Sequence, residues 1–221
     1  CKTDPRKPPL WQVKGARIIH DEQEKMIHFE QGSFELLGTP IAYFPYFSTP
    51  DPTVKRKSGW LMPVFSNTTK LGFVTQAPYF WALAPNYDLT LTPSVSTKQG
   101  PFMQAEFRHR LMNGAYAIRA AGIRQFDKDE FIHTNGEPTP GYRDWRGAIE
   151  SNGQFGLNRR WVWGWDALLI SDKTFYQDYQ VQTFTKDARS PFQNNEMQGV
   201  SQLYLVGRGN RSYFDARTIY Y

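Results

Sequence analysis

The chain has 221 residues, a net charge of +5 and a pI near 9.2, and 16% of its residues are aromatic. A mean hydropathy of −0.60 and a longest apolar run of only Tyr79–Ala84 exclude membrane-spanning helices, which need about 20 apolar residues. The positive charge does not indicate a nucleic-acid partner, because the Lys and Arg residues are dispersed and form no continuous basic patch.

The first part of the chain predicts a small β unit over residues 10–47. So short a segment cannot build a core of its own, and we expect it to be the end of a larger β domain. The composition of the segment predicts strands and turns in the following order: a strand at 10–19, a turn at 21–24, a strand at 25–29, a turn at 31–32 and a strand at 33–43.

A proline-rich stretch follows this unit. Pro45, Pro50 and Pro52 stand close together, and the basic run 55–57 comes directly after them. Proline has no amide hydrogen to give to a β ladder. We therefore expect residues 48–57 to be a linker.

From residue 58 onward, apolar and polar side chains alternate in segments of about ten residues. In the segment 87–98, Leu89, Leu91 and Val95 fall on one face, and Thr90 and Thr92 on the other. Repeated segments of this kind are typical of a transmembrane β-barrel, but a soluble β-sandwich alternates too, and the rhythm leaves both folds open. Strands are expected at 59–66, 71–83, 87–98, 102–111, 115–126, 144–156, 160–171, 175–185, 198–207 and 212–221.

Two further features favour the barrel. Short turns alternate with a long connection at 127–142, as the short periplasmic turns and longer outer loops of such barrels do. Trp161, Trp163 and Trp165 lie in a row on one face of a predicted strand. That row suits an aromatic girdle at a membrane interface, and in a soluble sandwich it would belong to the core.

The sequence contains no constellation that predicts catalysis or metal binding. The four histidines are dispersed, and there is no zinc-protease motif, nucleophile elbow, phosphate loop or paired-cysteine site. Asp127, Asp129 and Glu130 lack the spacing of a calcium loop and indicate a solvated turn. We expect no enzymatic activity, no cofactor and no metal.

Three prolines fall 15 residues apart, at Pro63, Pro78 and Pro93, in successive predicted strands. With a two-residue turn in the first hairpin, Pro63 would face Val74 and Pro78 would face Gly59. Each proline either removes a ladder bond from a seam that opens easily or simply marks a strand end, and both interpretations stay open.

The single cysteine, Cys1, cannot form an internal disulfide. It is either an unpaired thiol or half of a bridge to a cysteine outside this chain.

Specific motifs run from Cys1 to Arg110. A cysteine is followed by two prolines and a tryptophan, and four segments come after them: ARIIHDEQEKMI, GTPIAYFPYFSTPDPTVKRKSGWLMPVF, APYFWALAPNYDLTLTPSVSTKQGP and EFRHR. Together they resemble the LptD family, the outer-membrane proteins that assemble lipopolysaccharide. Beyond Gly122 only the strand rhythm continues, with no motif of this kind.

The resemblance implies an all-β fold, in which residues 1–47 are the end of a periplasmic β-jellyroll. Residues 58–221 would be the first strands of an antiparallel transmembrane β-barrel, and the chain would be a fragment of a longer protein. Cys1 would be bridged to a cysteine outside this chain. Pro63 and Pro78 would belong to the lateral gate of the barrel.

The resemblance further implies a translocon that places lipopolysaccharide in the outer leaflet without covalent chemistry. Its expected partners are lipopolysaccharide, a periplasmic bridge protein with a jellyroll, a lipoprotein plug and outer-membrane lipids. Four basic residues, Lys98, Arg108, Arg110 and Arg119, would face the lumen and contact phosphates. The alternative is a soluble β-sandwich, either a carbohydrate-binding module or a glycoside hydrolase, which heat-modifiable migration in detergent gels would distinguish from a barrel.

Overall fold

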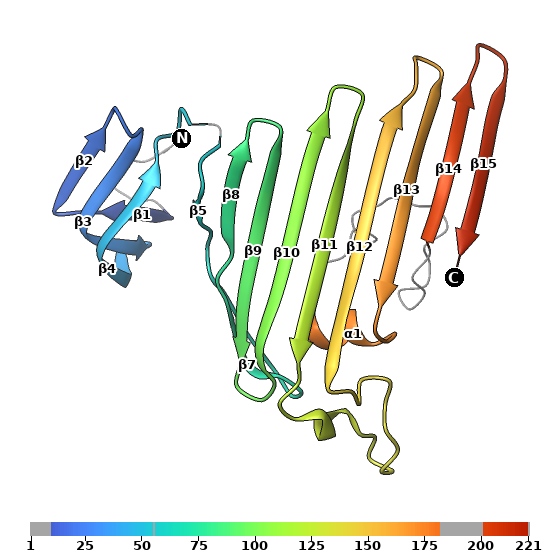
Figure 1. The fold of residues 1–221 in the computed structure, drawn as a ribbon. Coiled ribbons are helices and arrows are strands. Elements are labelled where there is room, and N and C mark those ends of the chain that lie inside the picture. Colours follow the sequence, from blue (N-terminus) through green and yellow to red (C-terminus); the bar gives the residue numbers. More distant parts are fainter. Residues whose placement is uncertain (1–9, 55, 182–200, 221) are drawn as a thin grey trace. The chain divides into compact units, whose positions relative to one another are not determined.

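A computed structural model describes residues 10–54, 56–181 and 201–220 (Figure 1). The chain divides into two compact units, residues 1–57 and residues 58–221. Nearly all of the regular structure is antiparallel β, which confirms the predicted all-β class. Among the described residues, no helix has the length and apolar character needed to cross a membrane.

The first unit is a four-stranded antiparallel sheet in which β3 pairs with the other three strands. A two-residue turn, Leu37 and Gly38, joins β3 to β4, and both residues have positive φ angles, as tight hairpin turns require. The strands of this unit are β1 (Trp11–Lys14), β2 (Arg17–Asp21), β3 (Met26–Leu36) and β4 (Thr39–Pro50).

The turn expected at 31–32 is wrong, because β3 continues through these residues. Gly32 pairs with Phe44 in β4, and a Cβ atom at Gly32 would overlap the ring of Phe47. The glycine therefore makes room for an aromatic ring that crosses the strand, and it does not mark a turn.

Strand β4 also extends into the segment expected to be a linker, residues 48–57, since it ends at Pro50. Among the described strands, β4 pairs only with β3. Within the described sheet it is an edge strand, where a proline is tolerated if its nitrogen points away from the partner. Clustered prolines were therefore a weaker signal of a linker than expected.

The second unit contains an 11-stranded antiparallel sheet, in which the strands from β9 to β15 are neighbours in chain order (Figure 1). The other side of β9 pairs with β7 and β8, which pair in turn with β6 and β5. The strands are β5 (Gly59–Trp60), β6 (Val64–Thr68), β7 (Gly72–Gln76), β8 (Tyr79–Ala84), β9 (Tyr87–Ser96), β10 (Gly100–Leu111), β11 (Gly114–Arg124), β12 (Trp145–Gly156), β13 (Trp161–Ile170), β14 (Ser201–Arg208) and β15 (Tyr213–Tyr220).

The strand predicted at 175–185 is wrong over its described part. Residues Phe175–Tyr179 form the short helix α1, and residues 182–185 lie outside the described residues. Phe175 and Tyr179 are four residues apart, so one helical turn buries both rings on the same side. The other helical turn, η1 (Lys128–Phe131), lies in the connection between β11 and β12.

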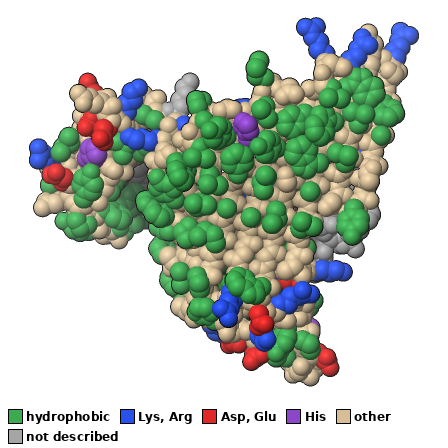
Figure 2. Space-filling view, in the orientation of Figure 1, with side chains coloured by type: hydrophobic (Ala, Val, Ile, Leu, Met, Phe, Trp, Pro, Cys, Tyr) green, Lys and Arg blue, Asp and Glu red, His purple; other side chains and the backbone are tan. Residues whose placement is uncertain are grey.

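The larger sheet has two different faces. In β9, Asp88, Ser94 and Ser96 are buried, whereas the intervening Val95 is 61% exposed. We call the side that carries Asp88 the polar face and the side that carries Val95 the apolar face. Figure 2 shows hydrophobic side chains spread over a broad face of this sheet, with charged side chains gathered near the strand ends.

An aromatic band crosses the apolar face near one end of the strands. The rings of Tyr87, Phe107, Tyr116, Trp165 and Phe155 follow one another across β9 to β13, with successive centroids 6.2, 6.1, 6.4 and 5.7 Å apart. Ring edges and faces attract each other over such distances. The band lies beside the short turns of the sheet.

A small hydrophobic core lies near the other end of the strands, on the polar face. There α1 and the connection that contains η1 pack against the sheet. The core residues are Leu71, Val74, Phe102, Ile123, Phe131, Ala148, Phe175, Tyr179 and Val181.

Candidate functional site

A ladder of alternating charges crosses the polar face from β9 to β12. Arg108 Nε lies 2.8 Å from an Asp88 oxygen and 3.9 Å from Glu106. Arg119 lies 3.2 Å from Glu106 and 3.9 Å from Glu150. The antiparallel register aligns Asp88 with Arg108, Glu106 with Arg119 and Arg119 with Glu150. We call this set the charge ladder, and its positive and negative charges alternate along the row.

A second polar group continues the same face over β13 to β15. The Gln202 amide donates to Asp166 at 2.5 Å, and the Arg217 guanidinium donates to Asp215 at 2.8 and 2.9 Å. Arg217 also lies 5.7 Å from the centroid of the Tyr204 ring. The polar face is thus hydrogen-bonded within itself across much of the sheet.

The four basic residues predicted to face a lumen do not form one cluster. Arg108 and Arg119 belong to the charge ladder. Lys98 lies in the turn between β9 and β10, where its Nζ is 2.6 Å from a Glu130 oxygen. Arg110 is exposed near the far end of β10, and no ion pair joins it to another described residue.

A buried arginine that the sequence analysis missed holds two connections over the polar face. Arg146 in β12 donates to the two Asp172 oxygens at 2.8 and 2.6 Å and to Asp178 at 2.9 Å. The side chain of Arg146 is fully buried. Beside it, the Tyr179 hydroxyl donates to Gln125 Oε1 at 2.6 Å. We call these five residues the Arg146 cluster.

Aromatic rings enclose the Arg146 cluster. The guanidinium carbon of Arg146 lies 4.8 Å from the ring centroid of Phe131 and 5.7 Å from that of Phe175. Burial by itself would raise the pKa of Asp172, but hydrogen bonds from Arg146 and Ser171 outweigh it and lower that pKa. Burial also raises the pKa of the Tyr179 hydroxyl. The Asp172 carboxylate therefore stays ionised near neutral pH.

Prolines interrupt the first two strands of the larger sheet. Pro63 lies between β5 and β6, and Pro78 lies between β7 and β8. Two hydrogen bonds span this level of the sheet, from the Leu61 amide to the Pro78 carbonyl (2.8 Å) and from the Ala77 amide to the Pro93 carbonyl (3.1 Å). Each predicted strand is thus two short strands separated at a proline.

The predicted partners of these two prolines are wrong. Val74 pairs with Ser66, and Gly59 pairs with Phe80. The first hairpin has a three-residue loop, residues 69–71, directly before Gly72, whose φ is +68°. This loop shifts the register from that of a two-residue turn.

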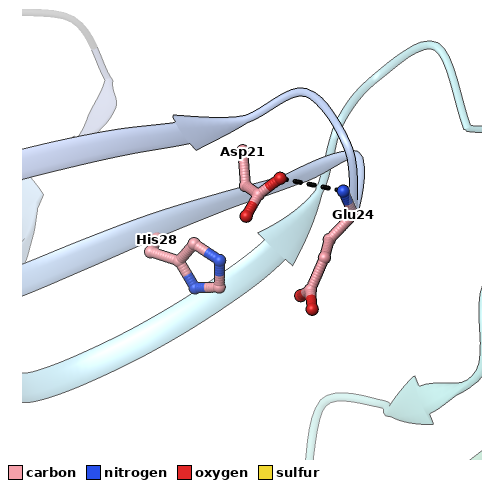
Figure 3. A group of neighbouring side chains, drawn as sticks. All are labelled: Asp21, Glu24 and His28. Carbon is pink, nitrogen blue, oxygen red and sulfur yellow. Dashed lines mark hydrogen bonds between the residues drawn. The ribbon is translucent and has the colours of Figure 1, made fainter.

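One group in the first unit has the composition of a metal site. Ligand atoms of Asp21, Glu24 and His28 lie within 4.8 Å of one another (Figure 3). The Asp21 carboxylate accepts hydrogen bonds from the backbone amides of Gln23 and Glu24, which lower its pKa. His28 Nδ1 lies 2.6 Å from the hydroxyl oxygen of Tyr46. These contacts explain the group as the turn between β2 and β3.

The sequence matches both a protein-family model and individual curated proteins. The family model described as LPS transport system D matches residues 144–221, which cover β12 to β15. The sequence analysis found no identifying motif in that region.

The curated relatives are LPS-assembly proteins LptD. The chain is 30% identical to the protein of Pectobacterium atrosepticum over 172 residues, 76% of this chain and 21% of the relative. It is 33% identical to that of Shewanella oneidensis over 144 residues, 64% of this chain and 18% of the relative. It is 32% identical to that of Pseudomonas aeruginosa over 168 residues, 76% of this chain and 17% of the relative. The chain spans about a fifth of the length of these relatives, and we conclude that it belongs to the LptD family.

Proposed function

We propose that the chain is part of an outer-membrane protein that assembles lipopolysaccharide in the outer leaflet. Residues 58–221 form the first strands of its barrel, and the unit before them includes the end of a periplasmic jellyroll. The observation that carries the proposal is the larger sheet, with one apolar and one hydrogen-bonded polar face. The names of the matched relatives, LPS-assembly protein LptD, point to the same substrate.

Exposure on the apolar face supports a lipid environment. Met103, Ile149 and Leu169 all lie on this face, and they are 49%, 53% and 73% exposed. A soluble sandwich would cover such residues with a second sheet. Hydrocarbon would cover them at no cost, while the aromatic band would lie at the level of the lipid headgroups.

The two faces suit a substrate with two chemistries. Lipopolysaccharide has acyl chains that avoid water and a phosphorylated head that avoids hydrocarbon. The jellyroll, together with a periplasmic bridge protein, delivers the acyl chains to the bilayer. The head passes along the polar face, inside a barrel plugged by a lipoprotein, and leaves sideways through a seam. No covalent step is needed.

Basic residues of the polar face are the proposed phosphate contacts. Arg110 is exposed and offers a guanidinium directly. Lys98, Arg108 and Arg119 are held by carboxylates, so a phosphate must exchange with Glu130, Asp88 or Glu106. Such exchange between charge-assisted bonds keeps each contact transient, which suits transport better than tight binding.

The first hairpin is the proposed gate. Strand β5 joins β8 through only two residue pairs, and Pro63 separates β5 from β6. Among the described strands, β5 and β6 pair on one side only, which leaves the other side for the last strand of a closed barrel. A seam with few backbone bonds opens at a low free-energy cost.

Replacing both Pro63 and Pro78 with alanine in the full-length protein is expected to slow lipopolysaccharide export. Each substitution restores an amide donor, and a net hydrogen bond contributes about 1 kcal/mol. The expected result is fewer lipopolysaccharide molecules at the cell surface and greater sensitivity to large hydrophobic antibiotics, with an unchanged amount of folded barrel.

Pro93→Ala is the matched control, because Pro93 lies within β9 and away from the edge. It should leave export unchanged. Normal export in the double variant would show that Pro63 and Pro78 only mark strand ends.

We also propose that Cys1, which lies outside the described residues, is bridged to a cysteine elsewhere in the full-length protein. Alkylation before reduction should then leave this thiol unlabelled, and non-reducing gels should show faster migration than reducing gels. A bridge that closes a long loop stabilises by about 4 kcal/mol in the chain-entropy account. Free alkylation of Cys1 in the mature protein would contradict the bridge.

A further inference from the structure

Four exposed arginines gather on two neighbouring turns of the larger sheet. Arg159 and Arg160 lie in the turn between β12 and β13, and Arg208 and Arg211 flank the turn between β14 and β15. The Arg208 amide donates to the Arg160 carbonyl at 2.8 Å, so the turns are adjacent. We call these four residues the arginine turns.

The charge of the arginine turns is not neutralised by nearby acids. The sequence has no Asp or Glu within residues 157–165 or 201–214. No ion pair joins any of the four arginines to a described carboxylate, in contrast to Lys98, Lys128 and Arg217. Figure 2 shows several basic side chains projecting from one end of the sheet without acidic neighbours.

Exposed apolar groups lie directly beside the arginine turns. Trp161 packs on Phe214 with a centroid distance of 5.4 Å, and Leu157 and Phe214 are about half exposed or more. These residues stand where the apolar face ends. Guanidinium groups next to aromatic rings at the border of an apolar surface are typical of the headgroup level of a membrane.

The opposite end of the strands has a different electrostatic character. There Lys98 pairs with Glu130, Lys128 with Asp144, and Lys70 with Asp178. Acidic residues therefore neutralise most of the basic residues at that opposite end. At the arginine turns, by contrast, no acidic residue balances the positive charge.

The strand register shows that the arginine turns lie at the end of the strands where β5 begins. Tyr87 pairs with His109, Leu111 with Gly114, Gly156 with Val162, and Trp161 with Gly207. Strand β5, which begins the second unit, starts at this same end, because it pairs with β8 just before the turn to β9. If the first unit is periplasmic, the arginine turns face the periplasmic leaflet.

We propose that the arginine turns bind the anionic phosphodiester headgroups of glycerophospholipids in the periplasmic leaflet. The inference rests on the proposed membrane location of the sheet and adds a lipid class to it. Phosphates accept paired hydrogen bonds from guanidinium groups, and each basic residue near an anionic surface contributes about fivefold in affinity. The adjacent Trp161 and Trp163 would rest in the acyl region just below.

The test uses the full-length protein in vesicles, with tryptophan fluorescence as the readout. Quenching by phosphatidylglycerol brominated near the carbonyl end of its acyl chains is compared with quenching by equally brominated phosphatidylcholine. The wild type should prefer phosphatidylglycerol, and high salt should weaken the preference. The variant Arg159→Gln/Arg211→Gln should lose about fivefold or more of this preference.

A charge-matched control is Arg143→Gln/Lys173→Gln, which removes two exposed basic residues near the opposite end. It should keep the wild-type preference, and heat-modifiable migration checks that both variants fold. Equal quenching by the two lipids in the wild type, an unchanged preference in the test variant, or an equal loss in the control would overturn the lipid site. Absence of quenching by either lipid would instead overturn the membrane location and with it the proposed function.

Discussion

Replacing Arg146 with methionine is expected to lower the free energy of unfolding by about 3 to 5 kcal/mol, the cost of breaking a buried ion pair from one side. The substitution keeps an apolar stem among the rings of Phe131 and Phe175 but leaves Asp172 and Asp178 facing each other without a cation. Lys70 still pairs with Asp178, so we expect the lower half of that range.

Urea unfolding at neutral pH, followed by heat-modifiable migration, measures this loss. The pKa of Asp172 is lowered in the folded protein, so its stabilising contribution is complete once the pH is above the ordinary pKa of 3.8. That contribution disappears as the pH falls through the lowered pKa.

Arg217→Met is the matched control, because its ion pair with Asp215 is partly exposed and should contribute less than about 1 kcal/mol. Equal losses for the two variants would show that burial of Arg146 adds nothing. Arg146→Met combined with Asp172→Asn and Asp178→Asn should recover part of the lost stability, since no carboxylate then remains unpaired.

Leu91→Arg is expected to make folding of the barrel into the membrane less favourable by about 2 to 4 kcal/mol. This is the free-energy cost of an arginine side chain near the middle of the bilayer. Leu91 lies near the centre of β9, on the same face as Val95 and opposite Ala105 of β10. An arginine there would project into hydrocarbon. The measurement is the fraction of protein with heat-modifiable migration after folding into vesicles.

The neighbouring substitution Thr92→Arg should be tolerated. Thr92 pairs with Gln104 on the polar face, where the added guanidinium meets water and carboxylates. Equal folding of the two variants would contradict the assignment of lipid and water to the two faces of β9.

The alternation of side chains was sufficient to predict most of the larger sheet. Each strand predicted from 87–98 to 160–171, and each of the last two, matches a strand of the structure to within a few residues. The polar and apolar faces of β9 also agree with the exposure of Ser94 and Val95. A two-sided environment imprints period two on a strand, and that pattern needs no knowledge of the neighbouring strands.

Contacts between strands were less predictable, because they depend on register. The charge ladder requires Glu106 to lie opposite Arg119, which the two-residue turn after Leu111 determines. In the first hairpin, the loop begins one residue later and is one residue longer than expected, which moves the partner of Val74 from Pro63 to Ser66. A single residue in a turn displaces all pairs that follow it.

The Arg146 cluster was missed for a related reason. Arg146 lies in a correctly predicted strand, but Asp172 fell between two predicted strands and Asp178 lies in a segment that was expected to be a strand. The spacing of Thr174 with Asp178 and of Phe175 with Tyr179 was the available signal for a helical turn. Two aromatic positions in a short segment did not outweigh its β-like composition.

The pairing of neighbours in chain order affects how the sheet can form. From β9 to β15 every described ladder joins strands consecutive in the chain, so contact order is low and each loop closes with a small entropy cost. Folding can then proceed as the successive addition of hairpins, in which each finished strand is the template for the next. In a closed barrel, the pairing of β5 and β6 with the last strand would join the residues most distant in sequence, and we expect it to be the slowest step.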